Sequence, residues 1–230
     1  MNDKIDVLDH GFVRLVDHMG TDLSVVRAAR VSYDAAWRAG EDQGSDSRLI
    51  NYLWKNKHTT PFEAVEFQFE VKAPIFVFRQ WHRHRTWSFN ELSARYRELP
   101  EEFYVPEPDM VGAQSKDNKQ ARNLAEGDLM VACVAIDAMR ASAAESFSTY
   151  RGLLERGVPR ELARSVLPMS TYSHMFAKVD LRNLLGFLDL RLHEHAQYEI
   201  RVYAEAMREL AKQVVPVCMG AWETSNGDAA

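Results

Sequence analysis

One short segment of the chain alternates strictly between apolar and polar side chains. The alternation covers residues 65–71, with apolar side chains at Val65, Phe67, Phe69 and Val71. Successive side chains of a β-strand point to opposite faces, so this pattern predicts a strand with one buried and one solvated face. We expect the strand to end over residues 72–74, at Pro74. Whatever else the chain forms, it must therefore contain a sheet.

Most of the remaining periodic segments have helical rather than strand spacing. Helices are predicted over residues 23–30, 47–57, 75–81, 120–154, 159–167, 181–192 and 196–215, and further strands over residues 11–18 and 171–179. Residues 82–97 are expected to form a loop that leads into a short helix, and residues 106–118 a surface loop. Pro61 suits the first turn of another helix, capped by Thr59 or Thr60. The balance favours an α+β fold, a helix-rich subunit with a small central sheet. We expect one domain over residues 1–225 and a disordered tail over residues 226–230.

Composition excludes several classes of protein. The 230 residues are 46% hydrophobic and 27% charged, with a net charge of −5, which argues against non-specific coating of nucleic acid. The two cysteines, Cys133 and Cys218, are too few for a disulfide framework and fit a reducing cytoplasm. The charged N-terminus does not resemble a signal peptide, and no apolar run is long enough to span a membrane.

Residues 79–97 invert the sign of the charge locally. They contain five arginines and a single acid, Glu91, within an acidic chain. The arginines are Arg79, Arg83, Arg85, Arg95 and Arg97, and the aromatic residues among them are Trp81, Trp87, Phe89 and Tyr96. Guanidinium forks suit phosphate, and aromatic faces suit planar rings, so the segment is typical of a nucleotide pocket. A solvated basic face is the alternative, which composition alone leaves open.

The spacing within this segment resembles a known family signature. Arg83-His84-Arg85 is followed after seven residues by Ser93, as in the RHR-x7-S signature of the flavin-dependent thymidylate synthases. Residues 58–81, 157–168 and 183–204 resemble the family's flanking blocks. The resemblance implies an α/β fold and a homotetramer whose active sites are shared between subunits. It also implies a methyltransferase that converts dUMP to dTMP with FAD, using NADPH and methylenetetrahydrofolate as co-substrates.

The resemblance assigns two sets of site residues. The set expected to bind dUMP is Gln80, Trp81, His82, Arg83, Glu91, Leu92, Ser93, Ala94, Arg95, Arg164 and Arg191. The set expected to bind FAD is Thr60, Arg83, His84, Arg85, Glu91, Asp180, Arg182 and His195, with His58, Glu63 and Gln197 nearby in the family blocks. The chain departs from the family at Asp180, where asparagine is frequent, and at Gly186, where a polar flavin contact is usual. Both departures affect the flavin contacts rather than the dUMP contacts.

Arg191 is the expected catalytic residue. The resemblance places it against the uracil, where a permanent positive charge favours ionisation at N3 and makes C5 nucleophilic. The alternative is a surface arginine that stabilises the C-terminus of a helix. We interpret Ser93 as a binding residue rather than a nucleophile, because no Ser-His pair is evident in its neighbourhood. Cys133 and Cys218 stand in apolar contexts and are interpreted as structural, so no cysteine nucleophile is expected.

Two other functions are compatible with parts of the sequence. His82-x-His84 and His193-x-His195 could belong to a metal-dependent hydrolase. Residues two apart on a helix point to different sides, however, and the flanking arginines would repel a cation, so we expect no metal. A nucleic-acid-binding module would need basic charge over a whole face, which this acidic chain lacks. The absence of any G-x-G argues against a classical dinucleotide-binding domain.

Overall fold

The computed structural model describes residues 3–227, which form a five-stranded antiparallel sheet and eight α-helices. The strands follow the order β1-β2-β3-β7-β4, with bounds Lys4–Val7 (β1), Gly11–Met19 (β2), Glu66–Pro74 (β3), Tyr172–Asp180 (β7) and Ser88–Glu91 (β4). The helices are Asp22–Arg30 (α1), Gln43–Lys55 (α2), Ile75–Trp81 (α3), Leu129–Glu155 (α4), Arg160–Ala163 (α5), Leu181–Arg191 (α6), Tyr198–Val214 (α7) and Pro216–Gly227 (α8). This arrangement confirms the helix-rich α+β fold with a small sheet.

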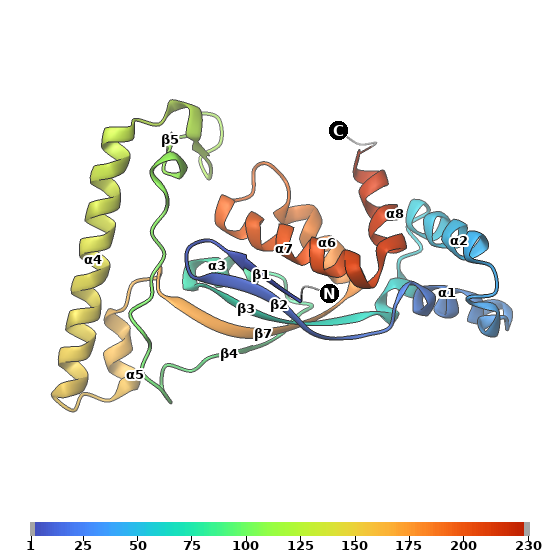
Figure 1. The fold of residues 1–230 in the computed structure, drawn as a ribbon, viewed down its shortest axis with the longest axis horizontal. Coiled ribbons are helices and arrows are strands. Elements are labelled where there is room, and N and C mark those ends of the chain that lie inside the picture. The colour runs from blue at the N-terminus through green and yellow to red at the C-terminus, as the bar shows by residue number, and fades with distance from the viewer. Residues whose placement is uncertain (1–2, 228–230) are drawn as a thin grey trace.

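Strand β3 lies at the centre of the sheet, between β2 and β7. Its apolar face is fully buried at Phe67, Phe69 and Val71, as the alternation predicts. Helices α6 and α7 lie against this face (Figure 1). The strand ends at Pro74, as expected, and the ladder still pairs Pro74 with Tyr172. Proline lacks only a donor, and it can therefore occupy the last position of a strand.

Three predictions for local structure are wrong. Residues 82–97 contain no short helix but the strand β4, which pairs with the edge of β7. Helix α4 begins at Leu129 rather than near Gln120, because the Asp128 side chain caps it by accepting the N–H groups of Met130 and Val131. The segment at Pro61 is a 3₁₀ helix, Thr60–Ala64, whose N-cap Thr59 makes no side-chain capping bond.

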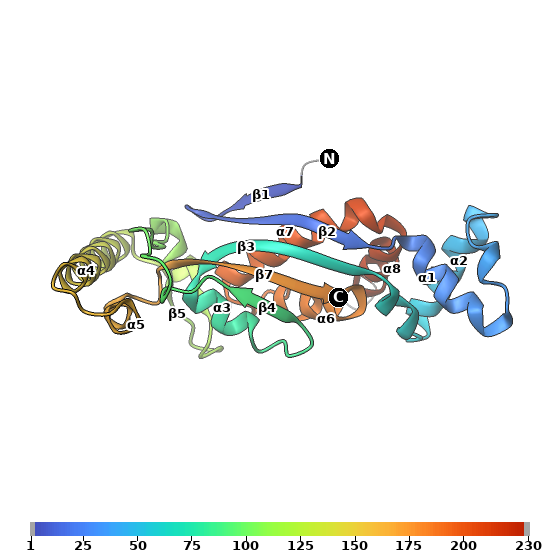
Figure 2. The same ribbon diagram turned by 90° about the horizontal axis from the view of Figure 1, so that it is seen from below.

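Helices α4 and α5 stand apart from the main core. Figure 2 shows them beyond one end of the sheet, with α1 and α2 at the other end. They have their own small apolar cluster around Phe147, Tyr150 and Ala163. Two short strands, Ala113–Gln114 (β5) and Arg122–Asn123 (β6), pair in the segment before α4. The single domain over residues 1–225 stays a prediction.

The end of the described chain is helical. Helix α8 was not predicted, and it extends through Gly227, so the expected tail begins too early. Trp54 Nε1 donates to Ser225 Oγ at 2.7 Å, which ties this helix to α2. Residues 228–230 of that tail lie outside the described residues. Within residues 3–227, no helix combines the length and the apolar composition that crossing a bilayer requires.

Candidate functional site

A cavity of about 430 Å³ lies beside the basic segment. It contains seven of the eleven residues expected to bind dUMP, together with six that were not predicted. Its lining includes Arg79, His82, Glu91, Leu92, Ser93, Ala94, Arg95, Arg164 and Ser173. Three guanidinium groups and one carboxylate give this cavity a net positive charge. Such a lining can hold the phosphate of a nucleotide.

Local folding explains how distant segments meet at this cavity. Helix α3 begins directly after β3, so Arg79 and His82 stand next to the sheet edge. The chain then returns as β4, and the backbone N–H of Leu92 donates to the carbonyl of His174 at 2.8 Å. Ser173 Oγ donates to Glu91 Oε1 at 2.9 Å. These contacts hold residues 91–95 against β7.

Ser93 makes a turn contact. Its Oγ accepts the backbone N–H of Arg95 at 3.3 Å. An O–H that already accepts such a bond still has its proton to donate, and phosphate oxygens are suitable acceptors. The arrangement agrees with binding by Ser93 rather than with a Ser-His pair.

Four arginines of the basic segment are exposed and have no acidic partner within residues 3–227. They are Arg79, Arg83, Arg85 and Arg97. By contrast, Arg14, Arg30, Arg122 and Arg151 each pair with a carboxylate. In an acidic chain, this concentration of unpaired cations creates a local attraction for anions.

Arg191 is not among the residues that line this cavity. It ends α6, and its Nε donates to His84 Nε2 at 3.0 Å while its Nη2 donates to the carbonyl oxygen of Gln80 at 3.2 Å. Burial, followed by the charge of Arg83, lowers the pKa of Arg191. The contact to Arg191 is made by the backbone carbonyl of Gln80, whereas Arg79 is among the residues that line the cavity.

His84 is held in its neutral form at this contact. Burial first, and then the charge of Arg191, lower its pKa from 6.5 to about 4. The Nε2 atom accepts from Arg191, so a neutral ring carries its proton on Nδ1. At neutral pH the pair thus consists of one cation and one neutral acceptor.

We expect stability to fall when the pH is lowered from 6.5 to 4. In this range the unfolded chain binds a proton at His84 that the folded chain does not bind. The free energy of unfolding should therefore decrease with decreasing pH, as measured by urea denaturation across a pH series. His84→Gln removes this titration and should reduce the decrease. An identical decrease in the variant would contradict the assignment.

Three residues expected to contact FAD lie at the opposite end of α6. Asp180 caps this helix, because its two oxygens accept from the backbone and the side chain of Asn183 at 2.9 and 2.6 Å. Arg182 pairs with Glu63, close to Thr60 in the 3₁₀ helix. Arg182 and Arg191 are nine positions apart, which corresponds to roughly 14 Å of helix. The structure of one chain thus divides the expected FAD contacts into two separate groups.

The expectation that the two histidines of each pair point to different sides does not hold for one of the pairs. His193 and His195 are not on a helix, and their ring centroids lie 4.9 Å apart. The statement that their side chains point to different sides is therefore wrong. His82 packs against Phe89, whereas His84 faces Arg191. Over the described residues, no three His, Cys, Asp or Glu side chains gather as a metal site.

Two of the residues that the sequence places in the site are buried. The Trp81 side chain is completely buried against Phe187, with ring centroids 5.0 Å apart, and Ala94 is also buried. Trp81 is therefore a core residue that supports the basic segment from within the protein. Sequence analysis missed Arg79, Ser173 and Phe187 as parts of the site. Arg79 had a signal, as a member of the basic segment, whereas the other two had none.

The cysteines differ from each other. Cys218 is buried, and burial together with Asp22 raises the pKa of its thiol. Such a thiol is a poor nucleophile. Cys133 is exposed on α4 in the single chain, and its interpretation as a structural residue stays a prediction.

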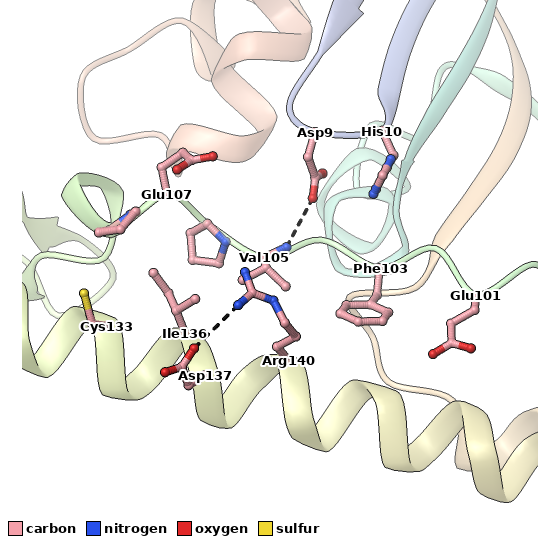
Figure 3. Close-up of a pocket in the computed structure, with 12 residues that line it drawn as sticks. Asp9, His10, Glu101, Phe103, Val105, Glu107, Cys133, Ile136, Asp137 and Arg140 are labelled. Carbon is pink, nitrogen blue, oxygen red and sulfur yellow. Dashed lines mark hydrogen bonds and ion pairs between the residues drawn. The ribbon is translucent and has the colours of Figure 1, made fainter.

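A larger cavity, of about 600 Å³, lies between the β1–β2 turn, the segment 101–108 and α4. Figure 3 shows four carboxylates around it, on Asp9, Glu101, Glu107 and Asp137, with Arg140 paired to Asp137. A lining of this charge repels phosphate. The smaller basic cavity is therefore the better candidate for a nucleotide, despite its size.

The matches to known proteins span both the residues of the basic cavity and Arg191. The pattern of a family described as thymidylate synthase complementing protein matches residues 14–217. A flavin-dependent thymidylate synthase of Thermus thermophilus is 51% identical over 219 residues, covering 95% of this chain and 78% of the relative. One from Ehrlichia ruminantium is 50% identical over 218 residues, covering 94% and 71%. The crystal structure of the UMP/dUMP methylase PolB from Streptomyces cacaoi, bound with 5-Br dUMP, superposes with a TM-score of 0.86 at 38% identity, covering 96% of this chain and 97% of that chain.

Proposed function

Because this chain belongs to the flavin-dependent thymidylate synthase family, we propose that its basic segment and Arg191 hold dUMP beside FAD for methylation to dTMP. The chain is a methyltransferase, and FAD is the cofactor that membership of the family implies. The observation that carries the assignment of the site is the group of unpaired arginines in an acidic chain. We further propose NADPH and methylenetetrahydrofolate as co-substrates.

The residues of the basic segment suit FAD. Arg83 and Arg85 offer unpaired guanidinium groups to a diphosphate. Thr60, Arg182 and His195 would provide further contacts, whereas the oxygens of Asp180 already cap α6. When bound, FAD supplies the redox chemistry between the reduced nicotinamide and the one-carbon unit. The chain's own residues bind and orient the reactants.

For dUMP, we assign the phosphate to the basic cavity and the uracil to Arg191. Ser93, Arg95 and Arg164 would donate to the phosphate oxygens, and Arg79 adds a further charge. Arg191 would stabilise negative charge that develops on the ring when the N3 proton leaves. Because the His84 ring is neutral, it does not compete with Arg191 for the negative charge on the uracil.

We propose that the site is completed by neighbouring subunits in a homotetramer. Within one chain, Arg191 is not part of the cavity lining, and the expected FAD contacts form two groups along α6. Surfaces of adjacent subunits could bring these groups together. Helix α4 also exposes large apolar side chains that a partner could cover, at Leu129, Met130, Val131, Val134 and Met139.

The decisive experiment combines a spectrum with an assay. The purified protein should show a flavin absorbance spectrum, or acquire one with added FAD, and NADPH should bleach it. It should form dTMP from dUMP only when NADPH and methylenetetrahydrofolate are both present, and UMP serves as the comparison substrate. A protein that binds no FAD and oxidises no NADPH would refute the proposal.

No cysteine is required for this chemistry. The double variant Cys133→Ala/Cys218→Ala is expected to retain dTMP formation, because the Cys218 thiol is buried and protonated and Cys133 lies on α4, away from Arg191 and the basic cavity. The measurement is kcat with saturating dUMP, together with the melting temperature. Loss of turnover by a variant that still folds would restore a cysteine mechanism.

The two cysteines and the acidic composition also support a cytoplasmic location without a nucleic-acid or membrane partner, which we propose on those grounds alone.

A further inference from the structure

The basic cavity contains an acid that does not pair with the cations around it. Among the described residues that line this cavity, Glu91 is the one acid, and it shares the lining with Arg79, Arg95 and Arg164. Within residues 3–227, Glu91 forms no ion pair with any of these arginines. Its Oε1 instead accepts the hydroxyl of Ser173 at 2.9 Å. The arginines are thus not neutralised by the carboxylate nearest to them in the cavity.

The backbone of Glu91 does not determine where its carboxylate lies. The ladder between β4 and β7 pairs Glu91 with Met175, and the N–H of Leu92 donates to the carbonyl of His174 at 2.8 Å. These contacts fix the Cα atom of Glu91, but its side chain is exposed and has three rotatable bonds beyond that atom. Within the described residues, the contact with Ser173 is the one hydrogen bond that the carboxylate makes. The direction of the carboxylate therefore depends on Ser173.

Ser173 is suited to hold this carboxylate in place. It lies within β7, where it pairs with Ala73 of β3, and only 3% of its surface is exposed. A carboxylate can only accept, so the serine hydroxyl is the donor. A buried hydroxyl without a partner costs free energy, and a hydrogen bond to a charged acceptor is stronger than one to a neutral acceptor. Both effects favour the contact between Ser173 and Glu91 over alternative positions of the carboxylate.

We propose that Ser173 is a positioning residue that keeps Glu91 from pairing with the arginines of the basic cavity, and that it thereby preserves their affinity for phosphate. The inference rests on the proposed function, in which this cavity holds the phosphate of dUMP. Without the Ser173 hydroxyl, the carboxylate is free to turn towards the guanidinium groups in the same cavity. A guanidinium fork that is paired with a carboxylate has fewer N–H groups to offer to a phosphate. Glu91 then competes with the phosphate of the substrate.

Ser173→Ala tests this inference through the affinity of the FAD-loaded protein for two ligands, dUMP and deoxyuridine. The two ligands share the base and the sugar, so the ratio of their dissociation constants reports the contribution of the phosphate. Calorimetry measures dUMP directly and deoxyuridine by displacement. The preference for dUMP should fall about fivefold in Ser173→Ala, because an exposed ion pair of this size must then be broken. Ser173→Thr keeps the hydroxyl and should keep the preference of the wild type.

Two further measurements separate this role from a purely structural one. In a Glu91→Gln background the side chain carries no charge, so adding Ser173→Ala should leave the preference for dUMP unchanged. Thr171→Val is the matched control, because Thr171 lies two positions before Ser173, is completely buried, and has a hydroxyl without a partner in the described part of the chain. It should also leave the preference unchanged. Loss of packing alone would lower the melting temperature without depending on the charge of residue 91.

The outcomes distinguish this inference from the proposed function. A preference for dUMP in Ser173→Ala equal to that of the wild type would overturn the inference alone. The same fall in the Glu91→Gln background would also overturn it, because the fall would then not arise from the carboxylate. A wild-type protein that binds dUMP no more tightly than deoxyuridine would overturn the phosphate site of the proposed function together with this inference.

Discussion

Replacing Arg191 with lysine is expected to lower kcat by about 100- to 1000-fold while FAD stays bound. Arg191 uses two nitrogens of one planar group to contact His84 and Gln80. A lysine ammonium is a point charge on a flexible stem and cannot reproduce that fork. The positive charge remains in the variant, but its position relative to the uracil does not.

The same prediction separates the two interpretations of Arg191. Arg191 lies in the last turn of α6, where any cation would interact favourably with the helix dipole. Arg27 occupies the last turn of α1 and is exposed, so Arg27→Lys is the matched control. If Arg191 only stabilised the helix end, both variants would behave alike. The measurements are single-turnover dTMP formation and FAD absorbance, and near-normal turnover in Arg191→Lys would refute the catalytic role.

Truncating Trp81 to alanine is expected to cost about 3–5 kcal/mol of unfolding free energy. The Trp81 ring is completely buried and packs against Phe187, Trp87 and Tyr203, with centroids 5.0, 5.9 and 6.1 Å away. Its removal leaves a large cavity directly beneath the segment that carries Gln80. We therefore expect lower activity as well as lower stability.

Urea denaturation at a fixed protein concentration measures this cost, since an oligomer's stability depends on concentration. Trp37→Ala is the control, because Trp37 is 73% exposed and its loss should change stability by about 0.5 kcal/mol or less. Trp81→Phe should cost much less than alanine, because the indole N–H has no hydrogen-bond partner within residues 3–227. A cost for Trp81→Ala as small as that for Trp37→Ala would show that the core does not depend on this ring.

Much of the secondary structure could be predicted because it depends on local spacing. The alternation in residues 65–71 predicts β3, and the helical spacing over residues 75–81 and 181–192 predicts α3 and α6. β1 and β4 have four residues each, too few for a period to show. Whether such a short segment forms a strand depends on the partner strand beside it. For β4 that partner is β7, which is far away in the chain.

The sequence by itself determined the family and the chemical character of the site, through the arginines of residues 79–97 and the spacing from Arg83 to Ser93. Residue type and spacing are sufficient for this, because charge and hydrogen-bonding capacity belong to the side chains themselves. Only the tertiary structure decided which of these residues line one cavity, that Trp81 is core, and that Arg191 contacts His84. Those properties depend on contacts between segments that the fold brings together, and no local pattern records them.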